Sequence, residues 1–163
     1  MGAWGYGLTE SDNALDYIDE LEGDYELKLH EILNGDISQK NLNSTKKEFL
    51  KHKKDIFKYT KETNTDYSGG TEILIYSALM SLFEEELSNK ELKEYKKGYK
   101  SAIDDLDSWG NAKEREEILK KLNKTILNKE RYIFSHKGLF QVMDEKSNPK
   151  EKEKNLDDVT LIL

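Results

Sequence analysis

The pattern of apolar and polar positions predicts helices along most of the chain, because apolar residues recur every three or four positions in several long stretches. The only Pro, at position 149, lies outside all of them. Helices are expected from Ser11 or Asp12 to about Leu33, over about 44–62, from Thr71 to 84–86, from Leu92 to 107–110 and over about 112–129. We therefore predict a mainly α protein, a single compact bundle of about five to six helices.

Local residues also predict where these helices begin and break. Gly23 predicts a break in the first helix, with Asp24 as the cap of a new one, because glycine disfavours helix interiors and Asp accepts hydrogen bonds from free helix amides. Ser44 or Thr45 is expected to cap the second helix. Gly110 predicts the end of the fourth.

The stretch that begins at Thr71 differs from the others because it is apolar on nearly every face. Its apolar residues are Ile73, Leu74, Ile75, Tyr76, Ala78, Leu79, Met80, Leu82, Phe83 and Leu87. A helix that is apolar all round is a buried one. We expect this helix at the centre of the bundle.

The C-terminal part gives a mixed signal. Apolar residues at 131–134 and 139–143 flank Ser135–Gly138, a pattern that fits a helix or a short hairpin, and the helical character of the rest of the chain favours a helix. Residues 145–155 are highly charged, and 158–163 are apolar and strand-like. We predict a helical domain over 1–144, then a charged linker and apolar tail over 145–163, with a small β element near the C-terminus as a further expectation.

The composition excludes several classes of site. The chain has no Cys, so disulfides, thiolate metal sites and a cysteine nucleophile are excluded.

No apolar run approaches the roughly 18 residues that a membrane span needs, and the first residues lack the features of a signal peptide. We therefore expect a cytoplasmic protein that does not bind a membrane.

Charge is distributed unevenly along the chain. There are 33 acidic and 26 basic residues, and the resulting charge of −7 differs from the basic balance typical of nucleic-acid-binding proteins. Ten Asp and Glu but one Lys lie between Glu10 and Asp36, whereas seven Lys lie between Lys46 and Lys61. An acidic segment is thus followed by a basic one.

The N-terminal stretch MGAWGYG alternates glycine with large aromatic residues. Glycine permits a tight, irregular backbone, so Trp4 and Tyr6 are expected to anchor an N-terminal plug at one end of the bundle. The alternative is a polar pocket beside Trp4, formed with Tyr6, Glu10, Asp12 and Asn13. Its carboxylates could act as general acid and base or bind a divalent cation.

These opening residues also resemble a known family. Residues 1–7, together with Glu10-Ser11-Asp12-Asn13-Ala14-Leu15-Asp16, resemble the start of the bacterial domain-of-unknown-function family 4259, whose members open with M-G-x-W-G-x-G and an E/D-N-D-x-A-x-D helix start. The resemblance covers about the first twenty residues, and the chain departs from the pattern at Ser11, where the family often has Asn. It implies a shared structural signature at the N-terminus and carries no activity with it.

Nucleic-acid binding by the basic segment and metal binding by the histidines are two further candidate functions. Lysines alternate with aromatic residues over 46–61, as in single-strand nucleic-acid binders, but no Arg lies there, and we expect a solvated basic face. His30, His52 and His136 lack metal-ligand spacing, since Glu26 with His30 supplies only two ligands. No nucleophile elbow, phosphate loop or dinucleotide signature is present, so we expect no metal, no cofactor and no catalytic residue.

The acidic segment gives the leading hypothesis, a non-catalytic binding protein that docks a basic partner. Acidic surfaces speed association with basic proteins and imitate nucleic acid, so an immunity or inhibitor protein that neutralises a basic toxin such as a nuclease fits best. The expected contact residues are Asp16, Tyr17, Asp19, Glu20, Asp24, Tyr25 and Glu31. The alternative is an enzyme that acts on a small molecule in the pocket beside Trp4.

Overall fold

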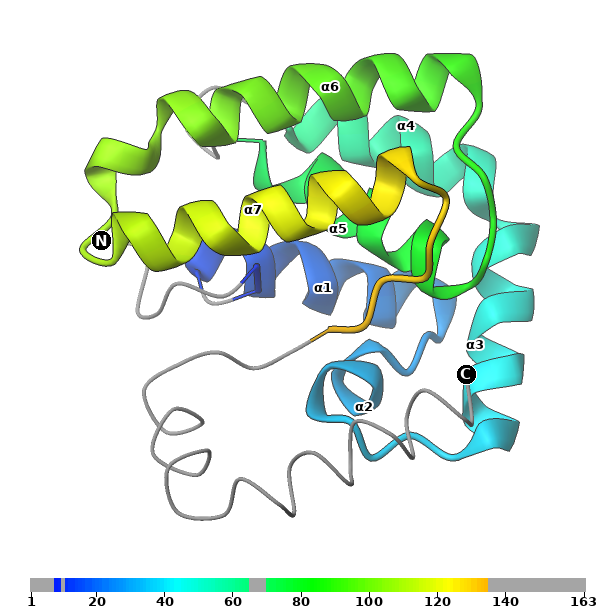
Figure 1. Ribbon diagram of the computed structural model, residues 1–163. Helices are drawn as coiled ribbons and strands as arrows, with labels where there is room; N and C mark the ends of the chain where they lie inside the picture. The colour runs from blue at the N-terminus through cyan, green and yellow to red at the C-terminus, as the bar shows by residue number, and fades with distance from the viewer. Residues whose placement is uncertain (1–7, 10, 65–69, 135–163) are drawn as a thin grey trace.

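The computed structural model describes residues 8, 9, 11–64 and 70–134, and every regular element within them is helical. In chain order these are α1 (Asp12–Tyr25), α2 (Leu29–Asn34), α3 (Gln39–Lys51), α4 (Lys53–Thr63), α5 (Thr71–Leu82), α6 (Asn89–Asp104), the 3-10 turn η2 (Leu106–Ser108) and α7 (Ala112–Leu127) (Figure 1). The predicted helical bundle is confirmed. The described residues hold seven α-helices because the helix expected over 44–62 is in fact two.

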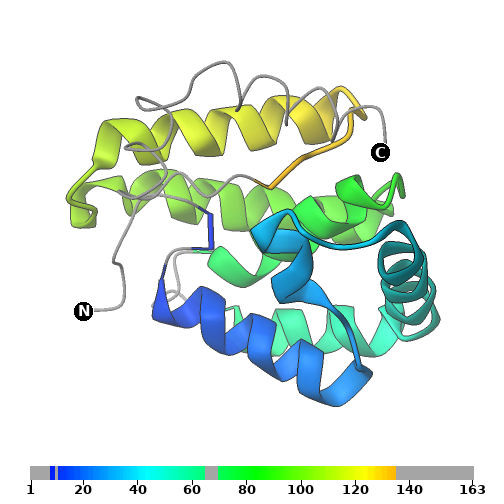
Figure 2. The same ribbon diagram turned by 90° about the horizontal axis from the view of Figure 1, so that it is seen from below.

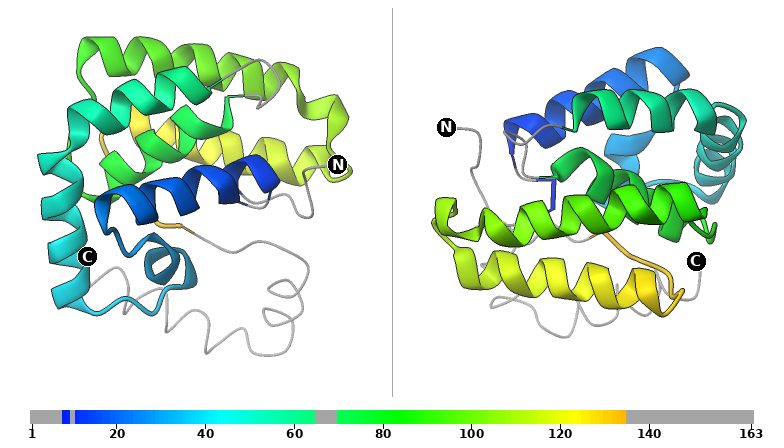
Figure 3. Two further views of the ribbon diagram at one scale, coloured as in Figure 1. Left: turned by 180° about the vertical axis from the view of Figure 1, so that it is seen from behind. Right: turned by 90° about the horizontal axis from the view of Figure 1, so that it is seen from above.

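The central helix is α5, as its apolar pattern predicts. All of its residues are buried, and α1, α4, α6 and α7 pack against it. Figure 1 and Figure 3 show α5 enclosed by these helices, with α6 on one side and α1 on the other. It ends at Leu82, just before the acidic residues 84–86 that predicted a return to solvent.

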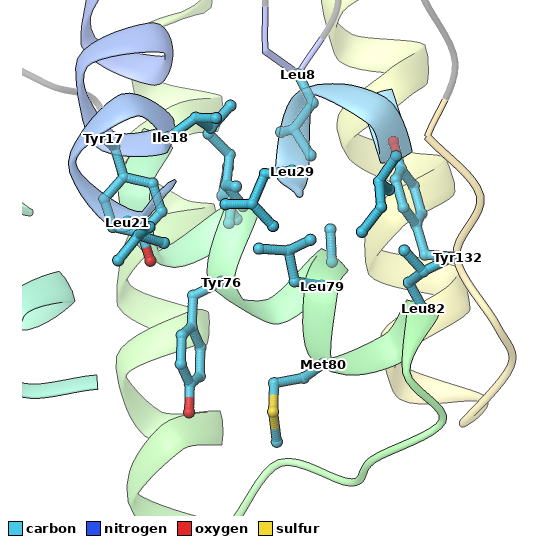
Figure 4. Packing of buried hydrophobic residues seen from close by; sticks show 14 of the residues in the cluster. Leu8, Tyr17, Ile18, Leu21, Leu29, Tyr76, Leu79, Met80, Leu82 and Tyr132 are labelled. Atoms are coloured by element: carbon cyan, nitrogen blue, oxygen red, sulfur yellow. The ribbon is translucent and has the colours of Figure 1, made fainter. Parts of the chain in front are cut away.

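The hydrophobic core joins side chains from several helices. Figure 4 shows Ile18 of α1 and Leu29 of α2 beside Leu79 of α5. On the side toward α3, the ring of Phe49 lies 5.7 Å from that of Tyr76, measured between ring centroids. Burial of these apolar side chains is the main force that holds α1 and α2 on α5.

The backbones of α5 and α6 approach each other at two glycines. Gly70, at the N-cap of α5, has φ 77°, which only glycine adopts readily. A Cβ on Gly70 would overlap the carbonyl oxygen of Gly98, and one on Gly98 would overlap Cγ2 of Ile73. The two glycines therefore determine how closely α6 lies on α5.

Side-chain hydrogen bonds determine several helix starts. The Ser11 hydroxyl accepts the backbone N–H of Ala14 at 3.2 Å, so the predicted start of α1 is confirmed. Ser88 begins α6 with a capping box, in which its hydroxyl accepts the N–H of Glu91 and the Glu91 carboxylate accepts the N–H of Ser88. The same carboxylate accepts a hydrogen bond from the hydroxyl of Tyr76. Glu91 thus ties the start of α6 to α5.

The break predicted at Gly23 is wrong. α1 continues through Gly23, and Glu26, with φ 56°, ends the helix in the left-handed conformation. The residue at the N-cap of α2 is Lys28 rather than Asp24. A glycine inside a helix costs only about 1 kcal/mol relative to alanine, which packing of the apolar face on α5 outweighs.

The helix expected over 44–62 is two helices that meet at His52. The first of them also starts earlier than predicted, because the hydroxyl of Ser38 accepts the N–H of Asn41 at 3.1 Å and caps it. Ser44 and Thr45 therefore lie inside α3 and cap nothing.

Contacts with the turn between α1 and α2 accompany this break. The hydroxyl of Thr45 accepts the backbone N–H of Lys28 at 3.2 Å. The ring of Tyr25 packs on His52, with the centroids 5.1 Å apart. Contacts between residues far apart in sequence do not affect the local pattern of apolar positions. The pattern over 44–62 therefore predicted one continuous helix.

The end predicted at Gly110 is also wrong, because α6 ends at Asp104 and η2 follows it. Residues 130–134 form no helix, although helix was favoured there. Instead, the Ser81 hydroxyl donates to the carbonyl of Glu130 at 2.7 Å and accepts the N–H of Tyr132 at 2.8 Å. The rest of the 131–143 element, the linker and tail over 145–163 and the β element lie outside the described residues.

Candidate functional site

Helix α1 has one buried and one acidic face. Its buried residues are Ala14, Tyr17, Ile18 and Leu21. The helix carries six Asp and Glu side chains and neither Lys nor Arg. Five of the six are exposed and form the acidic face, namely Asp12, Asp16, Asp19, Glu20 and Asp24. Figure 2 and the left view of Figure 3 show that α1 lies at the outside of the bundle.

The structure contradicts the assignment of Tyr17 as a contact residue. Its side chain is 2% exposed, and its hydroxyl lies 2.7 Å from Oγ1 of Thr60 on α4. Because that threonine donates its own hydrogen to the carbonyl of Ile56, Tyr17 is the donor of the pair. Burial raises the pKa of the Tyr17 phenol far above its usual range. Tyr17 therefore joins α1 to α4 and is not available to a partner.

Two other expected contact residues lie at the edge of the acidic face. Tyr25 and Glu31 are both half-buried. Glu31 accepts a hydrogen bond from the side-chain amide of Asn41 at 3.2 Å. Burial raises the pKa of Tyr25, and the carboxylates of Asp55 and Asp24 add to the effect. Both residues thus have intramolecular roles and border the surface that the exposed carboxylates form.

Tyr59 on α4 also borders the acidic face, although it is not among the expected contact residues. Its ring stacks on that of Tyr17, with centroids 6.0 Å apart. Burial raises the pKa of its phenol, and the carboxylates of Glu20 and Asp24 raise it further. The half-buried phenol therefore stays protonated and can donate a hydrogen bond. Tyr59 lies three positions after the buried Ile56, a helical spacing that indicates the buried side of α4. This spacing is the signal in the sequence that could have identified it.

Three ionisable side chains converge where α1 gives way to α2. Nε2 of His30 lies 2.8 Å from Oδ1 of Asp19 and 3.5 Å from Oε1 of Glu22. The other oxygen of Glu22 accepts the backbone N–H of His30 at 2.9 Å. Spacing along the sequence pairs His30 with Glu26, one helical turn away. The left-handed turn at Glu26 instead folds α2 back onto α1 and brings His30 to Asp19 and Glu22.

The pocket expected beside Trp4 falls largely outside the described residues, which include neither Trp4 nor Tyr6 nor Glu10. Asp12 and Asn13 are exposed in the first turn of α1, and neither caps the helix, because the preceding serine does. The pocket and the N-terminal plug both stay predictions.

The basic segment forms two separate helical surfaces. Its exposed lysines are Lys47, Lys51, Lys54, Lys58 and Lys61, while Lys46 and Lys53 are half-buried. The change of direction at His52 divides these lysines between α3 and α4. Nζ of Lys61 lies 5.0 Å from the ring centroid of Phe57, a cation–π distance. The nucleic-acid alternative thus loses the continuous helix on which it depended.

Two of the buried charged side chains contribute to the fold rather than to an accessible site. Arg115 is buried, and its guanidinium carbon lies 4.1 Å from the ring centroid of Trp109. Glu91 is buried at the start of α6 and binds the Tyr76 hydroxyl. Neither side chain reaches a surface that a partner could contact.

Comparison of the chain with protein-family models, curated proteins and solved structures finds no match. The family resemblance of the opening residues therefore stays a prediction. Within the part of the chain that the structure describes, no helix is both long enough and apolar enough to cross a bilayer.

Proposed function

We propose that this protein is a non-catalytic binding protein whose acidic face docks a basic protein. Most concretely, it is an immunity or inhibitor protein that neutralises a basic toxin such as a nuclease. The observation that supports this proposal is the single-sign surface of α1, with five exposed carboxylates and no Lys or Arg on the helix.

The chemistry of a nuclease explains why such a surface suits it. An enzyme that binds the phosphate backbone needs Lys and Arg at its substrate site. A row of carboxylates presents a comparable pattern of negative charge, attracts that site over a distance and blocks it once docked.

The packing of α1 supports a preformed docking surface. Its buried side chains lie against α5, and the Tyr17–Thr60 hydrogen bond joins it to α4. Because the backbone is held in place, docking orders only the exposed side chains, which keeps the entropic cost of association low. Tyr25 and Tyr59 at its edge add aromatic surface, which is enriched at protein interfaces.

The test is affinity capture with three forms of the full chain as bait: the wild type, the triple variant Asp19→Lys, Glu20→Lys, Asp24→Lys, and a matched control. The control reverses three exposed carboxylates away from α1, through Glu114→Lys, Glu117→Lys and Glu130→Lys. Circular dichroism confirms that each bait is folded.

We expect wild type and control to capture the same basic protein from a lysate of the cells of origin, and the α1 variant to lose it. The captured protein is then assayed for nuclease activity with and without bait. Equal capture by all three baits would exclude the acidic face as the docking surface. Inhibition that persists with the α1 variant would contradict the mechanism.

A further inference from the structure

The group formed by Asp19, Glu22 and His30 (the 19–22–30 cluster) has a geometry that the docking proposal does not require. One ligand atom from each residue lies within 4.8 Å of the other two. The two carboxylates come from successive turns of α1, and the imidazole comes from the first turn of α2. Exposed carboxylates alone are common on protein surfaces. The distinguishing feature here is an imidazole nitrogen that faces both of them.

The backbone holds these three side chains in place. Glu22 is fixed by its bond to the N–H of His30, which leaves its second oxygen toward the imidazole. Leu27 lies within the turn and Leu29 begins α2, and both are buried in the core. His30 is therefore positioned by the buried turn that precedes it, and little reorganisation is needed for the three side chains to bind one metal ion.

The distances suit a small divalent transition metal. Zinc binds imidazole nitrogen and carboxylate oxygen at about 2.0–2.2 Å, so two ligand atoms on one tetrahedral zinc lie about 3.3 Å apart. The 2.8 Å and 3.5 Å separations from Nε2 bracket that value. A nitrogen ligand favours zinc over calcium or magnesium, which prefer sites made of oxygen alone.

We propose that the 19–22–30 cluster binds a divalent transition metal of the zinc class, with three protein ligands and the remaining position open to solvent. The side chains of Asp19 and His30 are 64% and 42% exposed, so the ion can enter directly from water. Bound metal joins the end of α1 to the start of α2 and offsets one charge on the acidic face, that of Asp19, and one beside it, that of Glu22. The site does not depend on the proposed docking function.

The competing account is a plain ion pair, in which a protonated imidazole contacts the two carboxylates without metal. The two accounts differ in what they bind: the metal site takes up zinc saturably through a neutral imidazole, whereas the ion pair takes up none.

The experiment is isothermal titration of the full chain with zinc chloride alone, at pH 7.5 in a buffer that does not bind zinc. We expect one equivalent of zinc to bind the wild type, and His30→Gln to weaken binding by about tenfold or more. The matched control is His52→Gln, because among the described residues a single carboxylate, that of Glu48, lies within ion-pair distance of His52, at 3.7 Å. That control is expected to bind zinc as the wild type does.

Cobalt substitution provides a second readout, since its visible absorption reports nitrogen ligation and should be lost in His30→Gln. If His30→Gln fails to fold, Asp19→Asn takes its place, because that side chain is largely exposed and its loss leaves the core intact. The proposal is overturned if the wild type shows no saturable zinc binding, or if the variants in the 19–22–30 cluster bind zinc as tightly as the wild type.

Discussion

The hydroxyl of Tyr76 on α5 donates a hydrogen bond to the carboxylate of Glu91 on α6, and both side chains are buried. Burial raises the pKa of this phenol well above its usual range, and the bonded carboxylate raises it further. Tyr76 therefore remains the donor far into the alkaline range. The bond is the link between the central helix and the capping box at Ser88.

Removing that hydroxyl is expected to be costly. The variant Tyr76→Phe leaves a buried carboxylate with one partner fewer, so its free energy of unfolding should fall by about 1–3 kcal/mol. Urea denaturation measures the change. The control is Tyr99→Phe, a half-buried tyrosine on α6 whose hydroxyl bonds to no described residue. Equal losses of unfolding free energy in the two variants would show that the Tyr76–Glu91 hydrogen bond contributes no more to stability than the hydroxyl of Tyr99 does.

Replacing each of two glycines by alanine should change the stability of the protein in opposite directions. At Gly98 an added methyl group overlaps the side chain of Ile73, so Gly98→Ala should destabilise the protein by about 1–3 kcal/mol through overpacking. At Gly23, exposed within α1, a Cβ meets nothing within 4 Å. Gly23→Ala should therefore stabilise by about 0.5–1 kcal/mol. Thermal melts of both variants measure these changes. A raised melting temperature for Gly98→Ala contradicts the packing described at Gly98, and a lowered one for Gly23→Ala contradicts the open space described at Gly23.

Stability is expected to fall at alkaline pH, in part through Tyr132. Burial raises the pKa of Tyr132 to about 12, with Arg115 opposing the effect, whereas an unfolded tyrosine titrates near 10. Its contribution to stability is therefore fully present below about pH 10 and is lost as the pH rises toward 12, because only the unfolded chain ionises in that window. At pH 11 the loss is roughly 1 kcal/mol.

The measurement is urea unfolding of wild type and Tyr132→Phe at pH 8 and pH 11. The variant cannot ionise at this position, so its loss of stability between the two pH values should be smaller by roughly 1 kcal/mol. Identical losses would mean that the folded phenol titrates near its ordinary value.

Salt should slow docking of the captured partner. Attraction by the acidic face acts over a Debye length, which shrinks from about 10 Å at 0.1 M salt to about 3 Å at 1 M. The association rate constant of the wild type should fall by about tenfold or more over this range, while dissociation changes little. The neutral variant Asp19→Asn, Glu20→Gln, Asp24→Asn should show a much flatter dependence by stopped flow. A wild-type association rate constant that does not change with salt concentration contradicts electrostatic steering.

Much of the fold could be predicted because it depends on local pattern. The apolar sequence of α5 identified the central helix, and Ser11 marked the start of α1. The break at His52 could not be predicted, since no Gly or Pro lies there and the contacts that accompany it come from Tyr25 and from Lys28, far away in sequence. The left-handed residue that ends α1 is Glu26, a residue type that gives no local warning.

The candidate site, like the fold, could be predicted from the sequence only in part. The acidic face followed from sequence, because its carboxylates recur at helical spacing on a segment without cations. The burial of Tyr17 was missed, although it lies three residues after Ala14 and four before Leu21, both buried. The 19–22–30 cluster had no signal in spacing, because His30 reaches the two carboxylates only through the reversal of the chain after α1.

The hydroxyl of Ser81 holds Glu130 and Tyr132, which lie 49 and 51 positions away in sequence. The loop that these bonds close contains α6 and α7, and closing so long a loop is entropically unfavourable until both helices have docked. We therefore expect the contacts of Ser81 to form after the rate-limiting step of folding, so that Ser81→Ala speeds unfolding in stopped-flow kinetics and leaves the folding rate almost unchanged. One small hydroxyl at the end of the central helix would then govern the lifetime of the folded state rather than the speed at which it is reached.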